Sequence, residues 1–148
     1  GSERLTVSDA SDRISALRGK PVVVLLYKSW DGETRDVFLK LVEFLRQCQD
    51  SGAAVLGFAT DDEWEGIIQL RRYLREQGAP FPPVALYQWR SGALSRAMAG
   101  HGIRIGSLWK PPLIAVIGRD GTAIAQAQGI AHRSRLALGP VVDACSFR

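Results

Sequence analysis

Residues 22–34 read VVVLLYKSWDGET, and the change of pattern inside this stretch decides the fold class. The first six residues form a continuous apolar run, which is typical of a strand covered on both faces of an α/β sheet. After Trp30 the apolar residues take the spacing of a helix, with Gly52 as the stop signal. The apolar stripe of this helix consists of Phe38, Leu41, Val42, Leu45 and Cys48.

The rest of the chain continues this alternation of strands and helices. The turn signature GRDG at 118–121 predicts a hairpin, because Asp-Gly readily supplies positive φ angles. We therefore expect parallel crossovers first and an antiparallel hairpin last, in a mixed sheet of about five strands flanked by helices. The expected elements are a helix at 8–17 capped by Ser8 or Asp9, strands at 22–27, 53–59 and 81–86, a helix from Trp64 to near Gly78, a helical turn near 93–98, strands at 113–117 and 122–128, and a helix at 133–144.

Length and composition are those of a single globular domain. The chain has 148 residues, 46% of them apolar and 23% charged, which excludes disordered and coiled-coil classes. No apolar run reaches the roughly 18–20 residues that span a bilayer, and two cysteines do not make a disulfide scaffold. Gly1-Ser2 is typical of a cloning scar. We expect one domain over 1–148, which is also compatible with a module of a longer protein.

Charge is unevenly distributed along the sequence. Residues 1–80 hold 11 basic and 13 acidic side chains, a balance of −2, whereas residues 81–148 hold 8 and 2, a balance of +6. The basic residues of the second half are dispersed and match no nucleic-acid-binding motif. We interpret them as a solvated face and expect no nucleic-acid partner.

Four strings carry a family resemblance: LRGKPVVV at 17–24, Trp30, FPPV at 81–84 and PLIAVIGRDG at 112–121. In this order and spacing they resemble the thioredoxin fold, and within it the extracytoplasmic, often membrane-anchored TlpA/ResA-like thiol–disulfide oxidoreductases. The resemblance covers about residues 15–145. It implies a thioredoxin-like α/β fold with Pro112 at the family's cis-proline position. It also implies an extracytoplasmic, periplasmic location, which is compatible with a membrane anchor in the full-length protein.

The sequence departs from this family at the residues that do the chemistry. Where the family has Trp-Cys-x-x-Cys, this chain reads Trp30-Asp31-Gly32-Glu33-Thr34. Disulfide exchange needs a thiolate and a resolving thiol, and neither Asp31 nor Thr34 supplies sulfur. A carboxylate at Asp31 would instead cap the following helix. We therefore expect no disulfide oxidoreductase activity through a vestigial site made of Trp30, Asp31, Gly32, Glu33, Thr34 and Pro112.

The approach to Pro112 is longer than in the family, with eight residues between Ile103 and Pro112. The extra residues either cover the groove in which family members hold an extended peptide, or add aromatic and basic contacts to it. The candidate groove consists of Trp30, Trp109, Lys110, Pro111 and Pro112, and Trp89 and Tyr87 are candidates for the same aromatic surface. The alternative is that Trp30 packs under its own loop and Trp109 covers core. The groove interpretation predicts a redox-inactive module that binds a protein or peptide.

The two cysteines offer an enzymatic alternative. Cys48 lies on the apolar stripe of its helix, which predicts a buried, inert thiol. Cys145, near the end of the sequence, is expected to be more exposed and is the better candidate for a reactive thiol. A disulfide between them stays open, because sequence does not show whether their Cβ atoms meet. Oxidoreductase or peroxidase-like activity through Cys145 or Cys48 is thus the second hypothesis.

Other chemistry finds little support in the sequence. His101 and His132 have no metal-ligand partner at suitable spacing, so we expect neither metal nor cofactor. The acidic run at 61–63 is interpreted as helix capping, with a role beside the site as the alternative. No serine occupies a G-x-S-x-G elbow, and we expect no histidine near a nucleophile.

Overall fold

The apolar run of the deciding stretch forms strand β2 (Val22–Tyr27), and all six of its residues are buried. It pairs in parallel with β3 (Ala54–Ala59) and antiparallel with β5 (Leu113–Ile117), so it lies in the middle of the sheet as predicted. This computed structural model describes residues 3–28, 32–60, 64–90, 92–105, 112–128 and 144–145.

Six strands form one mixed sheet with the order β1-β4-β3-β2-β5-β6. The first four strands in this order run parallel, and the β5–β6 hairpin is antiparallel, which confirms the predicted topology and the α/β class. The remaining elements are β1 (Glu3–Thr6), β4 (Val84–Tyr87), β6 (Ala123–Gln128), α1 (Val7–Ser15), α2 (Gly32–Asp50), α3 (Trp64–Gln77) and α4 (Ala93–Ala99).

The edge strand β1 was not expected from the sequence. Its four residues are too few to give a periodic signal, and they become a strand by pairing with β4 in the register Glu3↔Val84. An ion pair of 2.7 Å between Glu3 and Arg13 joins β1 to α1. The predicted caps of α1 were also wrong. Thr6 is the N-cap, and its hydroxyl accepts a hydrogen bond from the Asp9 amide at 3.0 Å.

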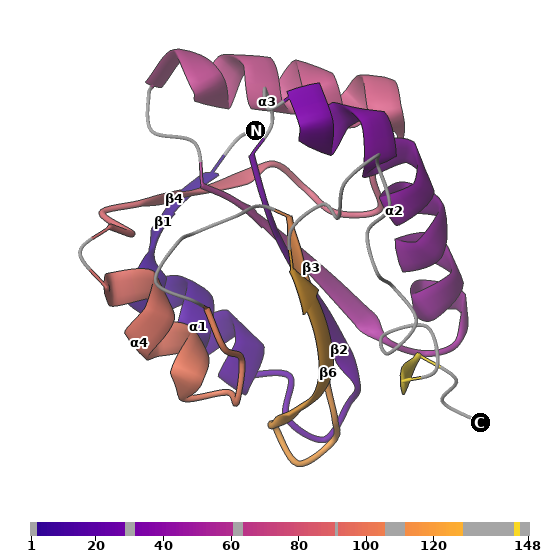
Figure 1. Cartoon of the computed structure of the whole chain (residues 1–148), viewed down its shortest axis with the longest axis vertical. Coiled ribbons are helices and arrows are strands. Elements are labelled where there is room, and N and C mark those ends of the chain that lie inside the picture. Colours follow the sequence, from indigo (N-terminus) through magenta and orange to yellow (C-terminus); the bar gives the residue numbers. More distant parts are fainter. Residues whose placement is uncertain are drawn as a thin grey trace.

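Helices cover both faces of the sheet, with α2 and α3 on one face and α1 and α4 on the other (Figure 1). Each face has its own apolar core, because successive side chains of a strand point to opposite sides. In β2, Val23, Leu25 and Tyr27 enter the core on the α2 face, whereas Val22, Val24 and Leu26 enter the core on the α1 face.

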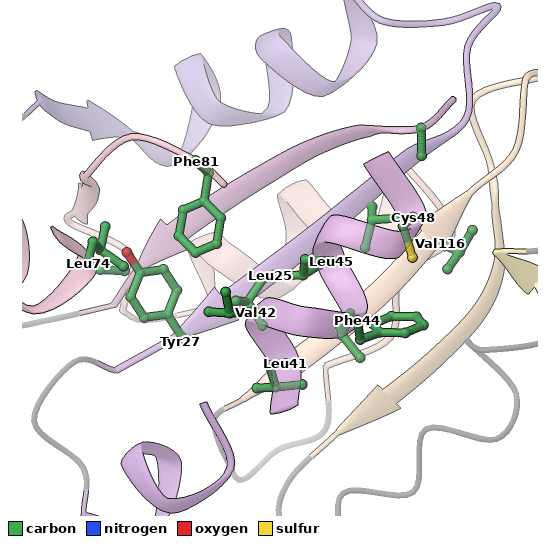
Figure 2. Close-up of a cluster of buried hydrophobic side chains, with 14 of the residues drawn as sticks. Leu25, Tyr27, Leu41, Val42, Phe44, Leu45, Cys48, Leu74, Phe81 and Val116 are labelled. Carbon is green, nitrogen blue, oxygen red and sulfur yellow. The ribbon is translucent and has the colours of Figure 1, made fainter. Parts of the chain in front are cut away.

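The core on the α2 face runs along α2 itself. Figure 2 shows Tyr27 and Phe81 at one end of this cluster and the Cys48 sulfur, close to Val116, at the other. Leu45 of the predicted helical stripe is fully buried between these ends. Burial of such a side chain contributes about 1.5–3 kcal/mol, so the stripe explains why α2 lies where it does.

The predicted hairpin forms as expected from its turn residues. Gly121 has a φ of 87°, and the Gly118 amide donates to the Thr122 carbonyl at 2.9 Å. The Asp120 carboxylate accepts hydrogen bonds from the amide and the hydroxyl of Thr122 at 3.0 and 2.9 Å. The turn residues thus fix the β5–β6 connection.

The predicted last helix at 133–144 falls almost wholly outside the described residues, of which only Ala144 and Cys145 belong to the carboxyl-terminal part. In the part of the chain that the structure describes, no helix has the length and apolar character needed to cross a membrane.

Candidate functional site

Helix α2 starts within the stretch that the sequence predicts as the vestigial site. Gly32, Glu33 and Thr34 form its first turn, five residues after the end of β2. Trp30 and Asp31 lie outside the described residues, and so do the side chains of Glu33 and Thr34. The first turn of a helix leaves backbone amides without intrahelical partners, which makes this end of α2 a donor surface.

Pro112 lies at the same end of the sheet. It is buried and directly precedes β5, whose Leu113 pairs antiparallel with Leu26. The register therefore puts Pro112 beside Tyr27, the last residue of β2 before the chain turns toward α2. The backbone thus brings two parts of the predicted site, Pro112 and the 32–34 turn, to one edge. Trp109, Lys110 and Pro111 fall outside the described residues.

The interior behind this edge is closed by Thr60 and two aromatic rings. Thr60, which follows β3, is fully buried, and its amide and hydroxyl donate to the Tyr27 carbonyl at 2.8 and 3.3 Å. The Tyr27 ring is fully buried and tilted by 59° against Phe81 at a centroid distance of 5.7 Å. These contacts join the ends of β2 and β3 into a rigid support. The acidic run at 61–63 lies outside the described residues.

Tyr87 and Trp89 of the predicted aromatic surface lie at the end of β4. Strand β3 separates β4 from β2, so the pair is displaced from Pro112 along the sheet edge. The Arg4 guanidinium lies 5.2 Å from the centre of the Tyr87 ring, and that of Arg90 lies 4.8 Å from the Trp89 ring. Trp89 also packs against the core on the α1 face, so part of its ring serves the fold.

The two cysteines are bonded to each other. The Cys48–Cys145 disulfide joins residues 97 positions apart, with a Cα–Cα distance of 5.5 Å. Cys48 is buried as predicted, with 1% exposure, but it is not a free thiol. Cys145 is more exposed than Cys48, as expected, but at 7% it is also buried. Its position near the end of the sequence gave no sign of the tertiary contact that buries it.

The disulfide is remote from the predicted site. Cys48 lies in the last turns of α2, and the sixteen steps of the chain from Gly32 to Cys48 extend roughly 24 Å along the helix axis. The bond to Cys48 puts Cys145 beside the end of α2 that is opposite to its start. The sulfur pair is therefore far from the end at which α2 begins.

One histidine does contact a hydroxyl nucleophile, contrary to expectation. The Nε2 atom of His101 lies 2.8 Å from Ser11 Oγ of α1, and His101 is 7% exposed. Burial lowers the pKa of His101 below its ordinary value, which favours the neutral ring. The contact ties α1 to the segment after α4. His132 lies outside the described residues, and within the described residues no cluster of three His, Cys, Asp or Glu side chains could bind a metal.

Gln126 was missed by sequence reasoning. Its side-chain amide bonds both polar groups of the Arg104 backbone: Oε1 accepts from the amide at 2.8 Å and Nε2 donates to the carbonyl at 2.7 Å. The Ala123 amide donates to the His101 carbonyl at 2.8 Å, so residues 101–104 are fastened to β6. The contacts of Ser11, Gln126 and Cys48 all join distant parts of the chain, and no local sequence pattern predicts them.

Comparisons with known proteins support the fold. No protein-family model matches the chain, and no curated protein matches it. Among solved structures, a putative thiol:disulfide interchange protein DsbE from Chlorobium tepidum aligns with a TM-score of 0.62 and 20% identity, covering 90% of this chain and 84% of that one. A thioredoxin-like superfamily protein aligns with a TM-score of 0.60 and 26% identity, covering 91% and 85%.

A secreted disulfide oxidoreductase from Mycobacterium tuberculosis, homologous to Escherichia coli DsbE, aligns with a TM-score of 0.57 and 14% identity, covering 89% of this chain and 81% of that one. The sheet order, the two helical layers and these alignments all indicate the same fold. The chain has a thioredoxin-like fold, and its structural neighbours are thioredoxin-family thiol:disulfide interchange proteins.

Proposed function

We propose that the protein is a redox-inactive thioredoxin-like domain that binds an extended peptide segment of a protein partner. The binding site is the sheet edge at which α2 begins and at which Pro112 precedes β5. Its side chains are those of the candidate groove: Trp30, Trp109, Lys110, Pro111 and Pro112. The structural neighbours are thiol:disulfide interchange proteins, and the proposal is that this chain retains their scaffold without their exchange chemistry.

The observation that carries the proposal is the location of the sulfur. The chain has two cysteines, and both are used in one disulfide near the far end of α2. Position 31 carries a carboxylate and position 34 a hydroxyl, neither of which can form the mixed disulfide through which exchange proceeds. A site without thiols at this edge can still hold a peptide, because binding needs only shape, apolar surface and backbone hydrogen bonds.

A second candidate function is thiol–disulfide exchange through Cys48 and Cys145 themselves. The existence of the bond favours it, since an exchange enzyme needs a pair that can be oxidised. Burial of both residues opposes it, because a substrate thiol must reach one of the sulfurs. The two candidates differ in a simple readout, the reduction of an external disulfide.

We further propose an extracytoplasmic location. A disulfide between two buried cysteines forms and persists in oxidising compartments and is rare in the cytosol. One of the similar structures is that of a secreted disulfide oxidoreductase, which agrees with this assignment.

Insulin reduction tests the proposal, with the motif rebuilt as the positive control. The wild-type protein should not catalyse reduction of insulin by dithiothreitol, whereas Asp31→Cys/Thr34→Cys should do so, because it restores both sulfurs at the start of α2. The matched control is Asp31→Ser/Thr34→Ser, which should stay inactive. Catalysis by the wild-type protein would contradict the proposal and favour Cys48 and Cys145 as an exchange pair.

Binding is measured with insulin B chain whose thiols are carboxymethylated, using fluorescence anisotropy. Wild-type protein should bind this probe, and Trp109→Ala should weaken binding at least about tenfold, as expected when an aromatic anchor is lost. Trp89→Phe, at the displaced end of β4, is the control and should leave affinity unchanged. Equal affinity of the Trp109→Ala variant and the wild type would contradict the assigned groove.

A further inference from the structure

The disulfide is enclosed by the apolar core on the α2 face. Cys48 is 1% exposed and Cys145 is 7% exposed, and both belong to the same buried cluster as Val116 and Ala127. Figure 2 shows the Cys48 sulfur at the end of this cluster where Val116 lies. Exchange requires a third sulfur to attack one of the bonded sulfurs. In the folded protein, the packing around Cys48 closes this route.

The bond also connects two parts of the chain that are distant in sequence. It closes a loop between residues 97 positions apart, and the entropy that such a bond removes from the unfolded chain grows with loop length. The core cluster that contains both cysteines also contains Ala127 of β6, and Ala125 and Ala144 pack against it. The covalent bond therefore joins Cys145 to α2 within a shared apolar core.

We propose that Cys48–Cys145 is a structural staple that the protein receives during folding, so that the chain is a substrate of disulfide formation. The partner that this requires is a disulfide donor, a molecule or protein that carries an exchangeable disulfide. This inference does not depend on peptide binding at the other end of α2.

The reaction is a two-electron exchange in two steps. The thiolate of one cysteine attacks a donor sulfur, the donor S–S bond breaks, and one donor sulfur leaves and takes up a proton. The second cysteine, as a thiolate, then attacks the cysteine sulfur of the mixed disulfide and releases the second donor thiol. The two cysteines lose two electrons and two protons, and the donor disulfide gains them. Because both residues are buried afterwards, these steps must precede closure of the core.

The first test compares reduction of the wild-type disulfide in folded and unfolded protein. Dithiothreitol is added with or without guanidinium chloride, and alkylation followed by intact-mass measurement gives the reduced fraction over time. We expect reduction of the folded protein to be at least about a hundredfold slower, because it must await opening of the core. Similar rates in both conditions would show an accessible, exchangeable pair and would overturn the proposal.

The second test removes the bond. Cys48→Ala/Cys145→Ala should keep the circular dichroism spectrum of the wild type but lower Tm by about 5–15 °C. The Tm of the Cys145→Ala variant should fall as far as that of the double variant, since both variants lose the same bond. An unchanged Tm would overturn the staple. If a variant fails to fold, the wild-type reduction rates still decide between the staple and an exchangeable pair, and the insulin assay tests the separate binding proposal.

Discussion

At Gly57, in the middle of β3, the absence of a side chain makes room for an aromatic ring. A Cβ built at this position would overlap the Phe81 ring atoms Cδ2 and Cε2 and would lie 2.9 Å from Cγ. Phe81 is 6% exposed and packs on Tyr27, so the ring has little room to move. The glycine is thus required by close packing rather than by a turn.

Gly57→Ala should therefore destabilise the protein by about 1–3 kcal/mol, the usual cost of overpacking a core. Urea denaturation measures the change. The matched control is Gly100→Ala, at a helical φ of −62° with a nearest neighbour at 3.4 Å from the added Cβ, which should be nearly neutral. Adding Phe81→Leu to the Gly57→Ala variant should recover part of the loss. A Gly57→Ala variant as stable as the wild type would show that Phe81 can move aside.

Between elements, hydrogen bonds and a close backbone contact fasten residues 101–104 to β6. The Gln126 side chain hydrogen-bonds both the amide and the carbonyl of Arg104. Gly102 has a φ of 76° and lies so close to β6 that an added Cβ would be 3.2 Å from the Ala123 nitrogen. Ile103 between them is fully buried in the core on the α1 face. Residues 102–104 are therefore held in place by β6 and by the core on the α1 face.

Gln126→Leu should release the Arg104 backbone at a cost of about 1–2 kcal/mol, since two hydrogen bonds are lost near solvent. Hydrogen exchange detects this locally: the Arg104 amide should exchange faster, while amides of β2 keep their protection. Gln128→Leu, the same change two residues along β6, is the control and should leave the Arg104 amide unaffected. Unchanged exchange at Arg104 in the Gln126→Leu variant would show that other contacts hold this segment.

For the whole molecule, stability should depend on pH through His101. Burial lowers its pKa from the ordinary 6.5, so the unfolded chain binds more protons than the folded one between these two values. The contribution of His101 to the free energy of unfolding is fully present above its pKa in the unfolded chain. It is lost as pH falls through 6.5 toward the lower pKa of the folded state. Urea denaturation at several pH values should show a decline beginning below about pH 7.5. His101→Gln should flatten the curve in this window, and an unchanged curve would contradict the assignment.

Two carboxylates affect the stability of the protein in a separate, more acidic pH range. The hydrogen bond from Arg13 lowers the pKa of Glu3, and the hydrogen bonds from Thr122 lower that of Asp120. Their contributions are present above the ordinary carboxyl pKa and disappear as pH falls through the lowered values. Acidification should therefore weaken the protein in two stages, first through His101 and later through these two carboxylates.

Local patterns were sufficient for most of the fold. The continuous apolar run at β2, the helical stripe of α2 and the turn at 118–121 each depend on neighbours in sequence. The run and the turn formed as predicted, and so did the described part of the stripe from Leu41 to Cys48. Strand β1 was missed because four residues carry no period, and its pairing with β4 supplies the missing stabilisation. The thioredoxin-like order of elements followed from these local signals and from the resemblance they carried.

The sequence by itself determined that positions 31 and 34 hold no sulfur, because Asp31 carries a carboxylate and Thr34 a hydroxyl. Only the tertiary structure decided that the two cysteine sulfurs form a disulfide and where it lies. Cys48 and Cys145 are 97 residues apart, and their bond depends on how α2, the β5–β6 hairpin and the carboxyl-terminal residues pack together. The same holds for Ser11 with His101 and for Gln126 with Arg104. Contacts between distant residues are fixed by packing of the whole chain, which leaves no periodic trace in the local sequence.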